Sequence, residues 1–248
     1  MTATMGALDE VVERAAALEA GGLRLPLRRA GEHGDGFVGA DALHAAGPLL
    51  DRRIAESAAG GDTDLAHVGA QWWLERCAWL AASAAFACAL SSGRLPSLRP
   101  ADVLVESVGG MPAALAFRDA PLAWPGGPGM APVLRRQLEA HLTPLVEAIV
   151  ALRLRPARAL WRSAGDRVVQ SALWAGEATG GREAAVGLAR EVLEAPTPMR
   201  VPVRLATGPS GVPMQQRASC CLAHRTPSGI VCETCPRAHG LDGRGAPR

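Results

Sequence analysis

Four of the six cysteines lie close together near the end of the chain, and clustered thiolates of this kind bind metals. They are Cys220, Cys221, Cys232 and Cys235. Four thiolates are the usual ligand set of a [2Fe-2S] or [4Fe-4S] cluster, and also of a structural zinc ion. The residue types therefore indicate a metal centre in this segment, and the spacing has to distinguish between the metals.

The spacing of these cysteines favours a two-iron cluster over zinc. Cys232 and Cys235 form a Cys-x-x-Cys pair whose sulfurs can reach one metal, and the turn residues 227–229 reverse the chain between the two pairs. The neighbouring side chains of Cys220 and Cys221 diverge in extended backbone, so they fit one tetrahedral metal poorly unless the backbone bends. A two-iron cluster is larger and offers two metal atoms to the thiolates, although spacing does not decide which cysteines share an iron. A zinc knuckle, or reactive or disulfide-bonded cysteines, stay open as alternatives.

The complete pattern resembles the C-terminal signature of the FhuF-like ferric-siderophore reductases. The signature consists of Cys-Cys, ten residues, Cys-x-x-Cys, a Pro-x-Gly turn between the pairs and a proline after them, here Pro236. Residues 141–150, followed by Leu160-Trp161, are similar to the preceding region of that family. The first hundred residues add little to the resemblance. In that family all four cysteines hold a [2Fe-2S] cluster, which implies the same role for all four here.

The resemblance implies a cytoplasmic reductase that delivers one electron to the Fe(III) of a ferric siderophore, with a hydroxamate-type chelate as the expected substrate. Hard oxygen ligands hold Fe(II) far more weakly than Fe(III), so one electron releases the metal and no covalent bond has to be attacked. The sequence shows no catalytic triad and no flavin or nicotinamide motif, so we expect electrons to come from a separate donor. The alternatives are a non-enzymatic zinc-stapled module that binds siderophores or proteins, and a generic [2Fe-2S] electron carrier. The sequence does not identify the substrate-contacting residues.

Composition narrows the class of protein. Hydrophobic residues make up 48% and charged residues 20%, which is typical of a globular protein, and the formal charge of +2 does not predict a nucleic-acid partner. The longest apolar run, residues 78–90, is shorter than the roughly 20 residues that span a bilayer, so we expect no integral membrane segment. Residues 1–20 carry four acidic side chains and lack the basic start of an export signal. These features predict a cytoplasmic location, where thiols stay reduced.

Helical periodicity dominates the chain and predicts an α+β protein that is mainly helical. We expect a helical core, a small β-hairpin element and a C-terminal cysteine-ligated cluster segment. The expected helices are 7–20, 64–90, 132–152, 156–175 and 182–195. The expected strands form a hairpin over 102–118 that turns at Gly109-Gly110, with a further short strand at 201–205. The predicted organisation is a mainly helical substrate and scaffold domain with a minor β element (1–195), a proline-rich connector (196–216), the [2Fe-2S]-binding segment (217–240) and a flexible tail (241–248).

Aromatic and cysteine side chains of the 64–90 helix have two interpretations. Trp72, Trp79 and Phe86 are seven residues apart and so share one helix face, where an aromatic core seam is favoured over a siderophore platform. Cys77 and Cys88 are too far apart along the helix to pair, and we expect buried, inert thiols.

The cysteine segment also carries a surplus of positive charge. Residues 217–248 contain five arginines and two acidic residues. This surplus would ease reduction of an anionic cluster or attract an acidic donor, and a solvated basic tail is the equal alternative. We expect His224, inside the motif, to be a neighbour of the cluster rather than a ligand.

Overall fold

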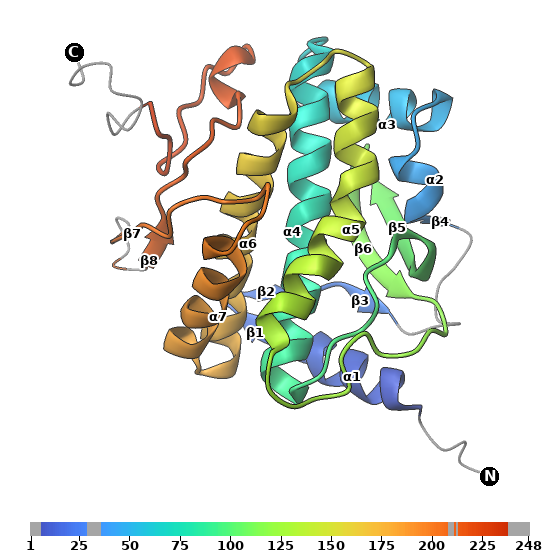
Figure 1. Ribbon diagram of the computed structural model, residues 1–248. Coiled ribbons are helices and arrows are strands. Elements are labelled where there is room, and N and C mark those ends of the chain that lie inside the picture. The colour runs from blue at the N-terminus through green and yellow to red at the C-terminus, as the bar shows by residue number, and fades with distance from the viewer. Residues whose placement is uncertain (1–5, 29–35, 208–210, 212, 238–248) are drawn as a thin grey trace.

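The computed structural model describes residues 6–28, 36–207, 211 and 213–237, and helices dominate it (Figure 1). The α-helices are α1 (Ala7–Ala16), α2 (Ala40–His44), α3 (Pro48–Ala59), α4 (Ala66–Ser92), α5 (Met130–Ala151), α6 (Ala157–Thr179) and α7 (Arg182–Glu194). The strands are β1 (Glu19–Ala20), β2 (Leu23–Arg24), β3 (Leu27–Arg28), β4 (Phe37–Gly39), β5 (Val103–Val108), β6 (Met111–Phe117), β7 (Leu205–Thr207) and β8 (Pro213–Gln215). Two short 3-10 helices are η1 (Pro100–Asp102) and η2 (Ala223–Arg225). The expected mainly helical α+β class is confirmed.

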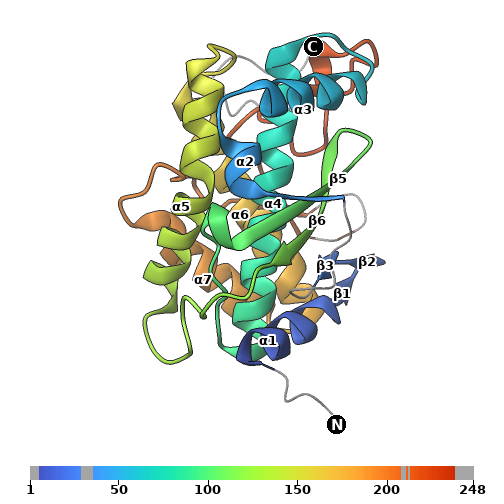
Figure 2. The same cartoon turned by 90° about the vertical axis from the view of Figure 1, so that its right-hand side faces the viewer.

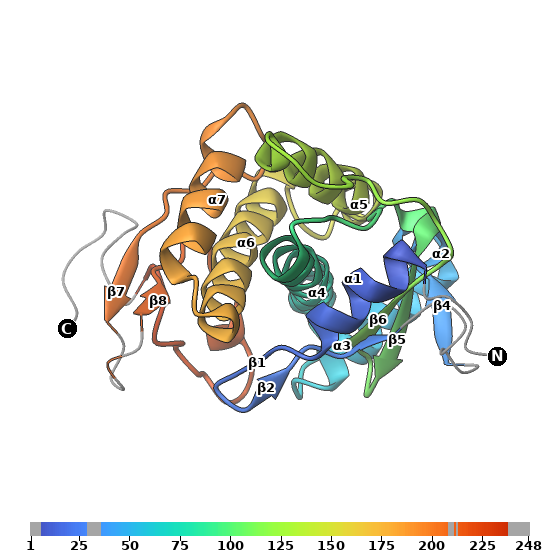
Figure 3. The same cartoon turned by 90° about the horizontal axis from the view of Figure 1, so that it is seen from below.

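Helix α4 is the centre of the fold. It is apolar around its whole circumference, which is typical of a helix buried on all sides. Helices α1, α3, α5 and α6 and strand β6 all pack against it, and the view along its axis shows it enclosed (Figure 3). Its side chains Trp73, Leu74 and Phe86 are fully buried. The predicted helix over 64–90 is therefore confirmed, with both ends displaced by two residues.

A four-stranded sheet covers one side of α4, in the order β3-β6-β5-β4 (Figure 2). The central pair β5–β6 is the predicted hairpin, and its turn residues Gly109 and Gly110 have φ angles of 56° and 77°. Positive φ at both turn positions is the requirement of the two-residue hairpin turn that glycine satisfies without strain. Strand β4 pairs antiparallel with β5, and β3 pairs parallel with β6.

Three predicted boundaries are wrong. The opening helix ends at Ala16 rather than at residue 20, because the chain turns there into the β1–β2 hairpin. Helix α6 continues past Gly176 to Thr179, and a Cβ atom on Gly176 would lie 2.8 Å from the Cβ of Ala185, so this glycine permits close packing of α7 instead of ending the helix. The strand expected at 201–205 is displaced to β7, which pairs with β8.

The C-terminal segment follows β8, and η2 is the one regular element in its described part, residues 216–237. It lies beside α6 and the neighbouring end of α4, on the side away from the large sheet (Figure 1). The tail predicted to be flexible, residues 241–248, lies outside the described residues. In the part of the chain that is described, no helix is both long and apolar enough to cross a membrane.

Candidate metal centre

The cysteine segment is held to α6 by one buried carboxylate. Asp166 is 2% exposed, and its two oxygens accept hydrogen bonds from the backbone N–H groups of Ala218 and Ser219, each at 2.9 Å. The hydroxyl of Ser219 donates to the same carboxylate. Burial raises the pKa of Asp166, and the hydrogen bonds from Ser219 and Ala218 oppose that rise. Three donors therefore fix the chain directly before the first cysteine.

A second buried carboxylate, Glu75 of α4, binds the arginine at the start of the segment. The guanidinium of Arg217 donates to one oxygen of Glu75, and that of Arg167 from α6 donates to the other. Glu75 is 3% exposed and Arg217 is 7% exposed. Burial alone would raise the pKa of Glu75, but the two arginines outweigh burial and lower it to about 2. The carboxylate therefore stays ionised, and it ties α4, α6 and the segment together.

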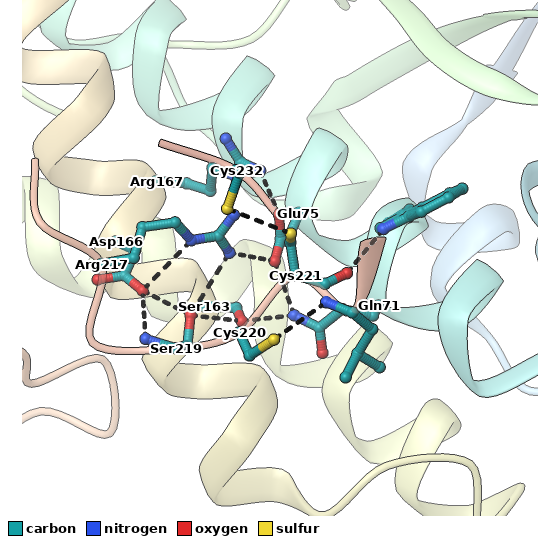
Figure 4. Close-up of polar contacts among 12 residues, drawn as sticks. Gln71, Glu75, Ser163, Asp166, Arg167, Arg217, Ser219, Cys220, Cys221 and Cys232 are labelled. Atoms are coloured by element: carbon teal, nitrogen blue, oxygen red, sulfur yellow. Dashed lines mark hydrogen bonds and ion pairs between the residues drawn. The ribbon is translucent and has the colours of Figure 1, made fainter. Parts of the chain in front are cut away.

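Uncharged side chains complete this anchor network, which we define as Gln71, Glu75, Ser163, Asp166, Arg167, Arg217 and Ser219 (Figure 4). Gln71 donates to both Glu75 and Ser163, and Ser163 donates to Ser219 at 2.9 Å. Next to the network, the indole N–H of Trp72 donates to the backbone carbonyl of Cys221 at 2.8 Å. Buried polar groups are stable only when they are hydrogen-bonded in this way.

The structure brings two of the four cysteines into contact. The Sγ atoms of Cys221 and Cys232 are 3.7 Å apart (Figure 4). The hydrogen bond from Cys232 lowers the pKa of Cys221 to about 6, and the backbone N–H of Ala223 and the charge of Arg217 act in the same direction. The same contact raises the pKa of Cys232, as does burial. The pair therefore shares one proton near neutral pH, with thiolate character on Cys221.

The other two cysteines have different contacts, although the charge of Cys235 raises the pKa of both Cys220 and Cys232. The Sγ of Cys220 lies 3.6 Å from Nδ1 of His224 and accepts the backbone N–H of Leu222 at 3.4 Å. Leu222, directly after Cys221, has a left-handed φ of 66°. Cys235 is 3% exposed, and its N–H donates to the carbonyl of Cys232 at 2.9 Å.

The donor set fits a thiolate-bound metal. All four cysteines are free, and two sulfurs about 2.3 Å from one tetrahedral metal would lie about 3.8 Å apart, close to the 3.7 Å between Cys221 and Cys232. Among the described residues, no three His, Cys, Asp or Glu side chains converge as a complete metal site. The pair Cys221–Cys232 is thus placed to share one metal, and the distance alone suits zinc as well as iron.

Other side chains named from the sequence have different surroundings. Cys77 and Cys88 are buried in α4, as expected, and burial raises the pKa of Cys88 to about 12, which favours the protonated thiol. Trp79 and Phe86 are buried, as a core seam requires, whereas Trp72 is only half-buried and contacts the cysteine segment.

Sequence reasoning missed the anchor network, and it counted Arg217 as part of a basic surface although that side chain is buried and paired. The available signals were isolated charges in apolar surroundings. Glu75 is the one acidic residue of the mainly apolar helix α4, and Arg217 stands three residues before the first cysteine.

A cavity of about 540 Å³ adjoins the cysteine pair. Its walls come from α4, α6, the β1–β2 turn, β8 and the cysteine segment, and both Cys221 and Cys232 line it. A second cavity of about 340 Å³ lies next to it and shares Trp72, Glu75, Arg167 and Gln170.

Comparison with known proteins identifies the two parts of the chain. Residues 71–197, just over half of its length, match the family described as "Ferric iron reductase FhuF-like transporter". Residues 217–237 match the "FhuF 2Fe-2S C-terminal domain". No curated protein matches the chain significantly. Among solved structures, the ATP-bound aerobactin synthetase IucA from a hypervirulent pathotype of Klebsiella pneumoniae is similar, with 16% sequence identity and a TM-score of 0.49. The similarity covers 64% of this chain and 32% of the synthetase.

Proposed function

Because the chain belongs to the FhuF-like ferric iron reductase family and carries its [2Fe-2S] C-terminal domain, we propose that it is a ferric-siderophore reductase. The reaction is the transfer of one electron to chelated Fe(III), which becomes Fe(II) and is released because hard oxygen ligands hold it weakly. The proposed substrate is a hydroxamate-type ferric siderophore, the proposed location is the cytoplasm, and a separate reductant supplies the electron.

The proposed cluster ligands are Cys220, Cys221, Cys232 and Cys235. The observation that carries this assignment is the contact between Cys221 and Cys232 at 3.7 Å inside a segment whose sequence matches a [2Fe-2S] domain. When bound, a [2Fe-2S] cluster supplies chemistry in steps of one electron. The chain's own residues hold the segment in place: Asp166 binds its backbone, and Glu75 binds Arg217.

The electrostatics of the segment support a redox role. A four-thiolate [2Fe-2S] unit is anionic and gains a further negative charge on reduction. Arg217, buried next to the cysteine pair, lowers the pKa of Cys221 and therefore stabilises negative charge on that sulfur. Glu75, the partner of Arg217, acts on Cys221 in the opposite direction but more weakly, so the side of the ion pair that Cys221 meets is positive and favours the reduced state of a centre bound there.

The first experiment measures iron, acid-labile sulfide and zinc in protein purified without oxygen, together with visible absorption and the EPR spectrum after reduction. We expect two irons and two sulfides per chain and an EPR signal of the reduced protein. A colourless, EPR-silent protein that contains stoichiometric zinc would instead establish the zinc-stapled module.

The second experiment tests the substrate. Protein reduced with dithionite and freed of excess reductant is mixed with a ferric trihydroxamate in the presence of a ferrous-iron trap. We expect the visible absorption of the oxidised cluster to return, with one Fe(II) trapped per electron. A reduced protein that is not reoxidised by any ferric chelate would leave only the role of a generic electron carrier.

A further inference from the structure

The cavity beside the cysteine pair has the features of a substrate site, and no function has been assigned to it so far. Its lining includes Cys221 and Cys232, whose sulfurs are in contact, but neither Cys220 nor Cys235. We propose that the ferric chelate binds in this cavity, against Trp72 and Trp174, and receives its electron from the side of Cys221 and Cys232. This inference rests on the proposed reductase function.

Two half-buried tryptophans line the cavity. Trp72 comes from α4 and Trp174 from α6, and each is held in position by its indole N–H. Trp72 donates to the carbonyl of Cys221 at 2.8 Å, and Trp174 donates to the carbonyl of Leu23 at 3.3 Å. Flat aromatic surfaces held in this way contribute contact area at little entropic cost. The volume of about 540 Å³ also lies in the range of ligand pockets, about 300–1,000 Å³.

Three buried polar atoms of the lining lack a hydrogen-bond partner within the described part of the chain. They are Oε1 of Gln215, whose side chain is almost entirely buried, and the Nε atoms of Arg167 and Arg217. Buried polar atoms without partners are rare in folded proteins, because each one costs free energy. These atoms lie beneath the surface of the cavity wall, so a ligand would reach them only after side chains of the wall move.

The charges of the cavity select among chelates. Glu75 is paired with Arg167 and Arg217, and Asp166 is satisfied by the backbone of the segment, so the floor offers no uncompensated positive charge. Glu177, which is exposed and also lines the cavity, adds one negative charge. A strongly anionic chelate is therefore disfavoured there, and an uncharged or cationic chelate is accepted.

The test separates binding from reduction by using a gallium(III) trihydroxamate. Ga(III) has the charge of Fe(III) but is not reduced, so its binding to the intact [2Fe-2S] protein can be measured by calorimetry. We expect Trp174→Ala to weaken binding about tenfold, as for one aromatic hot spot. Gln170→Trp, at an exposed position that lines both cavities, should fill part of the binding volume and weaken binding similarly. Binding of the gallium chelate should also shift the EPR signal of the reduced wild-type protein.

Trp161→Ala is the matched control. Trp161 also lies on α6 and is half-buried against the same core, but it does not line the cavity, so its replacement should leave the affinity unchanged. Unaltered affinity in both Trp174→Ala and Gln170→Trp, or no binding of the gallium chelate to the wild-type protein, would overturn the assignment of the cavity. If the ferric chelate still reoxidised the reduced protein in that case, the reductase function would stand and only the site would be wrong.

Discussion

Replacement of Glu75 by glutamine removes one charge from the anchor network while its shape is kept. Burial would raise the pKa of this carboxyl group, yet Arg167 and Arg217 lower it from 4.5 to about 2. At about 1.4 kcal/mol per pKa unit, the ionised form stabilises the folded protein by about 3 kcal/mol at neutral pH. Because the folded state has the lower pKa, this contribution is complete above about pH 5 and is lost as the pH falls from about 4.5 towards 2.

The assay is urea unfolding, followed by circular dichroism, of the metal-free protein between pH 7 and pH 2. Glu75→Gln should lower the free energy of unfolding by about 3 kcal/mol at pH 7. The difference from wild type should fall to half near about pH 3.3 and approach zero as the pH falls towards 2. Glu10→Gln is the matched control, because Glu10 also has two arginine partners, Arg14 at 2.8 Å and Arg94 at 3.2 Å, but is 41% exposed. That variant should lose less than about 1 kcal/mol. A deficit in Glu75→Gln that stays constant down to pH 2 would refute the ion-pair explanation.

Three further predictions concern the cysteines, the Trp72 contact and a buried histidine. Cys232→Ser should abolish the EPR signal of the reduced protein and leave the helical circular dichroism unchanged. Cys88→Ala, which replaces a buried thiol of α4, should keep the EPR signal. An unchanged EPR signal of Cys232→Ser would mean that the ligands are misassigned. Trp72→Phe removes the hydrogen bond to the carbonyl of Cys221, worth about 1 kcal/mol, and should speed the loss of iron to a chelator; equal rates would show that the contact does not hold the segment. Burial lowers the pKa of His141 from 6.5 to about 4, so the unfolded chain takes up that proton first, and this group should lower the free energy of unfolding by about 2 kcal/mol between pH 7 and pH 5. His141→Gln should reduce the slope by that amount and leave the share of His44, whose pKa burial also lowers.

The sequence predicted those parts of the molecule that depend on local pattern. The all-apolar stretch of α4 identified a buried helix, and Gly109-Gly110 identified a hairpin, because each needs only neighbouring residues to be recognised. The motif likewise singled out the four cysteines, since their types and spacing lie within one short segment.

Long-range pairings could not be predicted in this way. Arg217 and Glu75 are 142 residues apart in the chain, and Asp166 meets Ser219 across 53 residues, so no local pattern joins them. The period of seven among the aromatic residues of α4 did not reveal that Trp72 alone faces the cysteine segment, because the packing of that segment decides which aromatic side chain remains half-buried.

The position of the anchor network has a consequence for the cysteine motif as a unit. Residues 217–237 match a domain of their own in sequence, but every carboxylate that fixes the start of this segment belongs to α4 or α6. A synthetic peptide of these residues would carry all four thiols and none of those carboxylates, and its short, irregular backbone buries too little apolar surface to fold by itself. In this protein the motif depends on the helical domain for its structure, so transferring it to another scaffold requires transferring Glu75 and Asp166 as well.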